Sequence, residues 1–432
     1  MADERRGESG RCLDETPKCP YSEAKRMPRS SMRDALTDPD VEPGEVLETL
    51  RHLTVMGDGR PDTRPIETLE EQRELAEAKL GRFLANIADS NGARTVVERF
   101  YREEHGEDID AADLDALREW VPDVESILQD RRLPVVSKDI LREEYGVEGA
   151  PGGDGEGEVA RPHLMPAWVA GHDEEPVTTT TTTGTTGEPW GRPMTRNDAA
   201  VFGMNVMDFA WAILDDYGVE PERVALANPW PEAAIREPIG RALQAVGFRM
   251  QSFDYERIKA GGEEERAAVE AINEHFGSEE TGAIVYPVEL LLEGALGVHL
   301  RRGNLDLDVV INTAAPVKEE TMLADHGIEV YDIYGETEHP EPGLEKTIDG
   351  ETGYDIPLNT QLNLVYHEET DELAFEGTGR FAHLPFAVEG QAIPGVYLSG
   401  IRGTLTRTDD GHQLLSEIER VHDVGGCVGA EN

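Results

Sequence analysis

The stretch VTTTTTTGTTGEPWGRPMTRND, residues 177–198, decides how this chain is interpreted. Six threonines lead into Gly-Thr-Thr-Gly and then into Glu-Pro-Trp-Gly. Glycines let backbone N–H groups turn towards an anion without a Cβ in the way, and threonine hydroxyls can donate hydrogen bonds to phosphate oxygens. A threonine-rich run is also typical of a flexible linker. The stretch therefore poses a choice between a spacer and a phosphate-binding loop.

The flanking sequence favours the loop. The apolar segments PHLMPAWVAG and VFGMNVMDFAW lie on either side, and Thr195 or Asn197 is a candidate N-cap for the helix that we expect to follow. The GxxxxGK[ST] spacing of a P-loop is absent. The hydroxyls that could donate to phosphate belong to Thr183, Thr185 and Thr186.

A second candidate element is DIYGETE, residues 332–338, which follows the strand-like IEVY. An aromatic ring beside a glycine at a strand end could stack on a base, and Thr337 could hold phosphate. Glu338 could coordinate Mg²⁺, a hard cation that takes oxygen ligands. The alternative is a strand that ends in an acidic turn, which is common in so acidic a chain.

The order of elements predicts an α/β protein. Residues 1–60 are polar with little periodicity, and we expect a disordered leader. From Pro65 apolar residues recur at helical spacing, Thr68 and Glu71 resemble a capping box, and we expect helices to about Tyr145, with LPVVSKDILREEYG included.

Strand-like and helical segments then alternate. RVALANPW, TGAIVYPVELL, LDVVINTAA and IEVYDIYG read as strands, and NDAAVFGMNVMDFAWAILDDYG, EPIGRALQAVGFRM and EEERAAVEAINEHFG read as helices. This alternation indicates a largely parallel sheet, in which ligands lie beyond the carboxyl ends of the strands. After Gly343 the pattern is more β-like, and TQLNLVYHEETDELAFEG predicts a hairpin with a charged turn at residues 367–372.

Composition limits the functional classes. The chain has 88 Asp and Glu against 40 Lys and Arg, a formal net charge of -48, and only seven lysines. This balance argues against binding of a nucleic-acid backbone and indicates adaptation to high salt, in a halophile's cytoplasm; an ordinary acidic cytosolic protein is the alternative. Three cysteines make no disulfide framework, and neither a membrane-length apolar run nor a secretory signal is apparent. We therefore expect a cytoplasmic protein that binds neither nucleic acid nor membrane.

Taken together, the two motifs resemble those of a known family. TTTGTTGEPWG is similar to the phosphate loop of the adenylate-forming (ANL) superfamily, and DIYGETE resembles its Tyr-Gly-x-Thr/Ser-Glu motif. The closer resemblance is to phenylacetate–CoA ligases. It includes PIETLEEQRELAEAKLGRFL, LPVVSKDILREEYG, the Thr-Arg-Asn-Asp after the loop, and TAAPVKEE at the position of the adenine-pocket turn, and it runs from about Pro65 to Tyr366.

The resemblance implies both a fold and a reaction. The fold is a large N-terminal domain of two α/β subdomains and a β-rich subdomain. The reaction joins a carboxylic acid, aryl or acyl, to AMP from Mg²⁺-bound ATP, and a thiol such as coenzyme A then takes the acyl group. By resemblance, Tyr334 and Gly335 contact adenine, Thr337 contacts the α-phosphate, and Glu338 binds Mg²⁺, Thr337 and Glu338 being the catalytic pair. The residues implied to hold the phosphates are Thr183, Gly184, Thr185, Thr186 and Gly187.

The sequence departs from the family in three places. Trp190 replaces a lysine that many members carry, and Ile401 stands where the family has a ribose-binding aspartate. A different alignment puts Gln391 there, and Asp409 or Asp410 could substitute. The small C-terminal domain with its catalytic lysine looks truncated or absent, because only 31 residues follow Ile401 and none is lysine.

The expected division is therefore a leader (1–60), an AMP-binding domain (61–400) and a hinge remnant with tail (401–432), in which LLSEIERVHD could be a helix. A separate chain could supply the missing domain. The alternatives to an acid–thiol ligase are a non-catalytic nucleotide- or acyl-binding protein and acyl transfer to a protein, as in acyl-protein synthetases. The acid is not identified, because the candidate pocket residues could equally be core: Phe202, Met204, Trp211, Trp230 and Tyr286.

Overall fold

The structure is a computed structural model, and the residues it describes are 66–137, 140, 178–181, 191–194, 198, 205, 225–228, 249–252, 262–263, 267, 283–285, 309–312, 329–335, 343–358, 361–386, 392–408 and 411–421. The leader predicted for residues 1–60 lies outside these ranges.

Four helices precede the main sheet: α3 (Leu69–Asp89), α4 (Asn91–His105), α5 (Leu114–Trp120) and α6 (Val124–Leu128). The predicted capping box is confirmed, since the Glu71 backbone N–H donates to Thr68 Oγ1 at 3.2 Å and the Thr68 N–H donates to Glu71 Oε2 at 3.3 Å. The side chains of Ser90, Asp113 and Asp123 cap the next three helices by accepting hydrogen bonds from backbone N–H groups of the first turn. The expected helical segment therefore forms from Leu69 to Leu128.

The expectation of helix in LPVVSKDILREEYG is wrong over Val135–Ser137, which form strand β1. β-Branched valines favour an extended backbone, and β1 gains a parallel partner in β14 (Val396–Arg407). The approach is close: a Cβ on Gly395 would lie 2.1 Å from the carbonyl oxygen of Pro134, so only glycine fits there.

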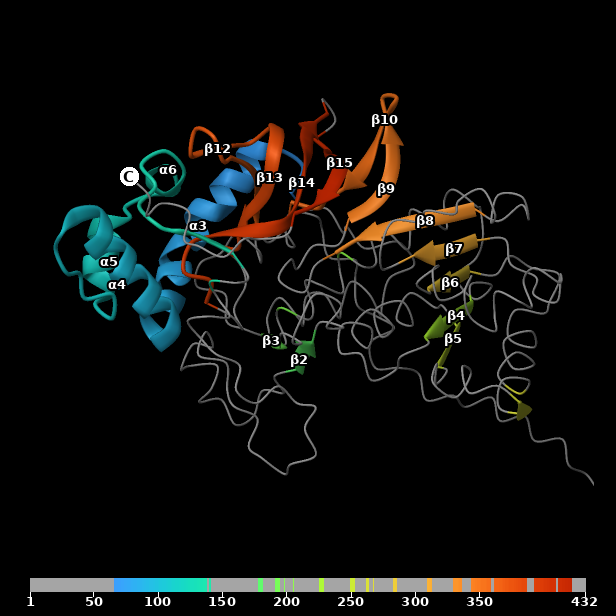
Figure 1. Cartoon of the computed structure of the whole chain (residues 1–432), viewed down its shortest axis with the longest axis horizontal. Coiled ribbons are helices and arrows are strands. Elements are labelled where there is room, and N and C mark those ends of the chain that lie inside the picture. Colours follow the sequence, from blue (N-terminus) through green and yellow to red (C-terminus); the bar gives the residue numbers. More distant parts are fainter. Residues whose placement is uncertain are drawn as a thin grey trace, which may run out of the picture.

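One large sheet contains most of the described strands, and β2–β3 and β4–β5 form two separate pairs. The order of the large sheet is β12-β11-β13-β14-β15-β10-β9-β8-β7-β6, and β1 joins it beside β14, which makes eleven strands. The strands β6–β8 are parallel, whereas β8 pairs antiparallel with β9, and the antiparallel pairing continues to β12 (Figure 1). The bounds are β6 (Ala283–Val285), β7 (Val309–Asn312), β8 (Glu329–Tyr334), β9 (Gly343–Ile348), β10 (Glu351–Asp355), β11 (Leu362–His367), β12 (Glu372–Ala374), β13 (Gly377–Leu384) and β15 (Gln413–Arg420).

The four predicted strands before Gly343 are confirmed as β4 (Ala225–Asn228), β6, β7 and β8. β4 pairs in parallel with β5 (Arg249–Ser252) and lies beside β6. Arg249 and Met250 were expected at the end of a helix and are instead in β5, because pairing with β4 satisfies their backbone groups. Of the other expected helices only isolated positions are described, and Asp198, Asn205, Glu263 and Ala267 are helical.

The C-terminal part corrects one expectation and confirms another. The hairpin is confirmed, since β11 and β12 pair antiparallel and His367 faces Glu372 across the turn. The suggested helix LLSEIERVHD is wrong: Gln413–Arg420 are strand β15, held between β14 and β10, and Leu415 is fully buried. β14 runs continuously through residue 401, where we placed the start of a hinge remnant.

Two apolar clusters lie on alternate residues of the antiparallel strands. The helix-side core joins α3–α6 to β1, β11, β13 and the start of β14, and Figure 1 shows α3 between β13 and the helices α4 and α5. The second, here called the strand-end cluster, consists of Ile356, Val365, Phe381, Ile401, Leu405 and Leu415 with the partly buried Tyr334, Tyr354 and Ile418. On β13, Ala382 and Leu384 enter the helix-side core, whereas Phe381 enters the strand-end cluster.

Within the described residues, no helix is both long enough and apolar enough to cross a membrane.

Candidate functional site

The threonine run begins as a strand. β2 (Thr178–Thr181) pairs antiparallel with β3 (Gly191–Met194), so that Thr178 faces Met194 and Thr181 faces Gly191. Residues 182–190 therefore connect two paired strands. The residues expected to bind phosphate lie in this connection, outside the described residues: Thr183, Gly184, Thr185, Thr186 and Gly187.

The second motif begins at the carboxyl end of β8. β7 and β8 are adjacent and parallel, and Asn312 pairs with Asp332, so their carboxyl ends meet at one edge of the sheet. The segment TAAPVKEE starts directly after β7, and Gly335 follows β8. The two segments assigned to the adenine pocket thus start on neighbouring strands. Thr337 and Glu338 lie in the connection from β8 to β9, outside the described residues.

Tyr334 is the best-defined residue of the candidate site. It is half-buried, and the next residue, Gly335, is exposed. Its ring centroid lies 5.7 Å from that of Tyr354 and 6.2 Å from that of Phe381, the latter in an edge-on arrangement. Its hydroxyl lies 3.4 Å from Oγ of Ser399. The ring is therefore supported from β10 and β13 and contacted at its tip from β14.

Ile401 occupies the same neighbourhood. Its side chain is 6% exposed and belongs to the strand-end cluster, against which Tyr334 packs. The structure thus brings together Tyr334 and the position where the family's ribose-binding aspartate was expected. An isoleucine offers no hydrogen bond to a ribose hydroxyl. The other candidates, Gln391, Asp409 and Asp410, lie outside the described residues.

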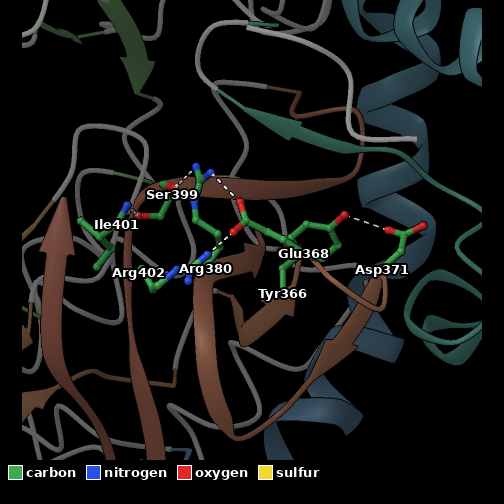
Figure 2. A network of polar contacts seen from close by, with 7 residues as sticks. All are labelled: Tyr366, Glu368, Asp371, Arg380, Ser399, Ile401 and Arg402. Atoms are coloured by element: carbon green, nitrogen blue, oxygen red, sulfur yellow. Dashed lines mark hydrogen bonds and ion pairs between the residues drawn. The ribbon is translucent and has the colours of Figure 1, made fainter. Parts of the chain in front are cut away.

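Arg380, a buried residue of β13, binds the backbone of β14 at Ser399. Nε and Nη2 of Arg380 donate to the carbonyl oxygen of Ser399 at 3.2 and 2.7 Å, and Nη1 lies 3.3 Å from Oε1 of Glu368 (Figure 2). Arg402 bonds the other oxygen of Glu368. The side chain of Arg380 is 4% exposed, so its charge needs this pairing.

Sequence reasoning missed Arg380, Ser399 and Glu368. The signal was an arginine inside the strand-like GTGRFAHL, next to positions that alternate into the core. A charged residue at such a place predicts a buried ion pair or a site.

A separate polar contact in Figure 2 fastens the β11–β12 turn. The Tyr366 hydroxyl donates to Oδ1 of Asp371 at 2.8 Å, and Nη1 of Arg131 lies 2.8 Å from the same oxygen. Burial, followed by the hydrogen bond to Asp371, raises the pKa of Tyr366 to about 12. This tyrosine stays neutral, and the Arg131–Asp371 ion pair ties the segment after α6 to the hairpin.

A third polar cluster joins β9, β10 and the turn before β15. The buried Asp355 accepts from Nζ of Lys346 at 2.9 Å and lies 3.1 Å from Nδ1 of His412. By alternation Asp355 points away from the face that carries Tyr354. Among the residues that the structure describes, no group of three or more His, Cys, Asp or Glu side chains could hold a metal ion.

Comparison with known proteins gives a distant structural similarity. The sequence matches no protein-family model and no curated protein. Solved structures that it resembles include the adenylation domain of a keto acid-selecting NRPS module bound to keto acyl adenylate, at 14% identity and a TM-score of 0.36 over 55% of this chain and 52% of that one. The Bacillus subtilis O-succinylbenzoate coenzyme A synthetase in complex with AMP gives 16% identity and a TM-score of 0.36 over 57% and 62%. The luciferase-like enzyme of the mealworm Zophobas morio gives 16% and 0.36 over 57% and 58%.

The chain spans about half to three fifths of the length of these structures. The finding is a distant similarity to adenylate-forming enzymes over part of a mixed α/β chain. Because the TM-scores are 0.36, this similarity does not establish the chemistry of this protein.

Proposed function

We propose that this protein activates a carboxylic acid with ATP, forming an acyl-adenylate and releasing pyrophosphate. The observation that carries the proposal is the position of Tyr334-Gly335 at the carboxyl end of β8, beside the end of β7 in a parallel sheet. This edge is where α/β sheets bind nucleotides. The pairing of β2 with β3, the strands on either side of the Thr/Gly segment, supports the same function.

The burial of the described residues supports a base-binding role at this strand end. Tyr334 is only half-buried, and Gly335 is exposed and has no side chain that would block access to it. In the proposed reaction Tyr334 packs on adenine, Thr337 contacts the α-phosphate, Glu338 binds Mg²⁺, and the loop residues Thr183 to Gly187 hold the phosphates. Bound Mg²⁺ would neutralise charge on the phosphates. The protein then contributes positioning of the acid, the base and the phosphate chain.

The finer part of the proposal is a phenylacetate–CoA ligase-like acid–thiol ligase, acting on an aryl or acyl acid with coenzyme A as the acceptor. A separate chain would supply the small domain needed for the second step. Acyl transfer to a protein is the variant in which the acceptor differs. The excess of acidic residues supports adaptation to high salt and a cytoplasmic location.

Ile401 favours a second candidate function. A buried isoleucine where the ribose-binding aspartate was expected suits a protein that binds a nucleotide or acyl ligand without turning it over. The two candidates differ in products rather than in binding.

The test is product analysis in molar KCl with ATP, Mg²⁺, hydroxylamine and a panel of aryl and fatty acids. Acid activation releases AMP in equal amount to the hydroxamate of one acid, and Glu338→Ala abolishes both. ATP that raises the melting temperature without any AMP supports the non-catalytic binder. Release of ADP instead of AMP contradicts acid adenylation.

A further inference from the structure

We infer that Ser399 is a positioning residue for nucleotide binding: its hydroxyl fixes the ring of Tyr334, and the Arg380–Glu368 pair holds Ser399 in place. The inference rests on the proposed function, in which Tyr334 packs on the adenine base. It adds three residues to the site that neither motif contains.

The hydroxyl of Ser399 has the capacity for this contact. Ser399 is fully buried, and its Oγ accepts a hydrogen bond from the Ile401 backbone N–H at 3.2 Å. A serine hydroxyl can both donate and accept hydrogen bonds. In the contact with the Tyr334 hydroxyl at 3.4 Å, either oxygen can therefore be the donor.

Three contacts together define the orientation of the Tyr334 ring. Phe381 meets it edge-on at an interplanar angle of 79°, and Tyr354 packs against it at 50°. These contacts limit rotation of the ring, and the Ser399 hydroxyl adds a contact at the tip of the ring. A ring already held in its binding orientation loses less conformational freedom when a base stacks on it.

The position of Ser399 is itself fixed by Arg380 and, through Arg380, by Glu368. Two N–H groups of Arg380 converge on its carbonyl oxygen, and Glu368 fixes the remaining end of that guanidinium. Arg402 bonds the second oxygen of Glu368, so the carboxylate cannot rotate freely. The chain of contacts runs from the exposed Glu368–Arg402 pair to the half-buried ring at the strand end.

The experiment is a double-mutant cycle on ATP affinity, measured by calorimetry in molar KCl with Mg²⁺. Tyr334→Phe and Ser399→Ala should each weaken ATP binding about threefold to tenfold, the effect of one net hydrogen bond. The double variant should bind no more weakly than Ser399→Ala alone, because that change already removes the contact with the Tyr334 hydroxyl. Affinity for Mg²⁺-tripolyphosphate, which has no base, should stay unchanged in all three.

Two further variants control the cycle. Thr378→Val removes the hydroxyl contact between Thr378 on β13 and Thr404 on β14, whose oxygens lie 2.8 Å apart. It should leave ATP affinity unchanged. Ser399→Thr retains a hydroxyl and should restore most of the affinity. Tyr334→Phe removes a single oxygen from a half-buried ring, so it carries the test alone if Ser399→Ala does not fold.

The outcomes separate this inference from the function on which it rests. ATP binding by the wild-type protein with additive losses in the double variant overturns the positioning role only. An equal loss of tripolyphosphate affinity also overturns the positioning role, because the substitutions would then weaken binding of a ligand that has no base. Wild-type protein that binds no ATP overturns the proposed function and the positioning role together.

Discussion

Two tyrosines on separate strands of the same sheet, Tyr366 on β11 and Tyr334 on β8, have opposite environments. Tyr366 is fully buried in the helix-side core, and its hydroxyl is fixed by Asp371. Tyr334 belongs to the strand-end cluster but stays half-exposed, with its hydroxyl beside Ser399. The helix-side core encloses Tyr366, whereas Tyr334 packs only partly buried against the strand-end cluster. Tyr366 therefore stabilises the fold, whereas the fold positions Tyr334 for the proposed ligand.

The largest expected effect is on the helix-side core. Leu75→Ala removes a side chain that is 1% exposed in α3 and should lower the free energy of unfolding by about 2–5 kcal/mol. ATP affinity of the folded protein should not change. Denaturant unfolding and calorimetry measure the two quantities, and the exposed Glu70→Ala on the same helix is the matched control. If Leu75→Ala bound ATP more weakly under conditions in which it is folded, the helix-side core would not be separate from the candidate site, and the account would be contradicted.

The reverse pattern is expected for Tyr334→Ala. Loss of the ring should weaken ATP binding by about tenfold to a hundredfold, the range for an aromatic side chain stacked on a base. Unfolding free energy should fall by less than in Leu75→Ala, because the ring is only half-buried. Unchanged ATP affinity would show that the base does not bind at this strand end.

Asp355→Asn tests the polar cluster on the face away from Tyr354. The substitution removes the charge that faces Lys346 and His412, and unfolding free energy should fall by about 1–3 kcal/mol. The expected loss of unfolding free energy is modest because the side chain of Lys346 is 26% exposed and that of His412 is 31% exposed, so water screens both partners. Asp115→Asn, at a 94% exposed side chain, is the control and should have no measurable effect. A change in ATP affinity would place this cluster in the site.

The smallest effect concerns pH. The pKa of Tyr366 is raised to about 12 from an ordinary value of 10, so the unfolded chain loses this proton first as pH rises. Its contribution to stability is fully present below pH 10 and is lost as pH rises towards 12. Tyr366→Phe should therefore flatten the fall of unfolding free energy across that interval. Equal slopes in wild type and Tyr366→Phe would contradict the raised pKa.

Local signals predicted the elements that local chemistry determines. The Thr68–Glu71 box, the strands β4, β6, β7 and β8, and the β11–β12 hairpin follow from capping, β-branched runs and turn residues. β1 and β15 were missed because a partner strand decides their conformation, and LLSEIER has the composition of a helix. Ser399 and Arg380 could not be paired from sequence, because the contact depends on register across β13 and β14.

The central claim is acid activation at the end of β8, and carboxylate-dependent exchange of labelled pyrophosphate into ATP tests it most directly. In molar KCl with Mg²⁺, the wild-type protein should exchange label only when one class of aryl or fatty acid is present. Exchange should be abolished in Glu338→Ala and reduced in Tyr334→Ala. Folded wild-type protein that shows no exchange with any acid, or exchange that persists in Glu338→Ala, would contradict the account.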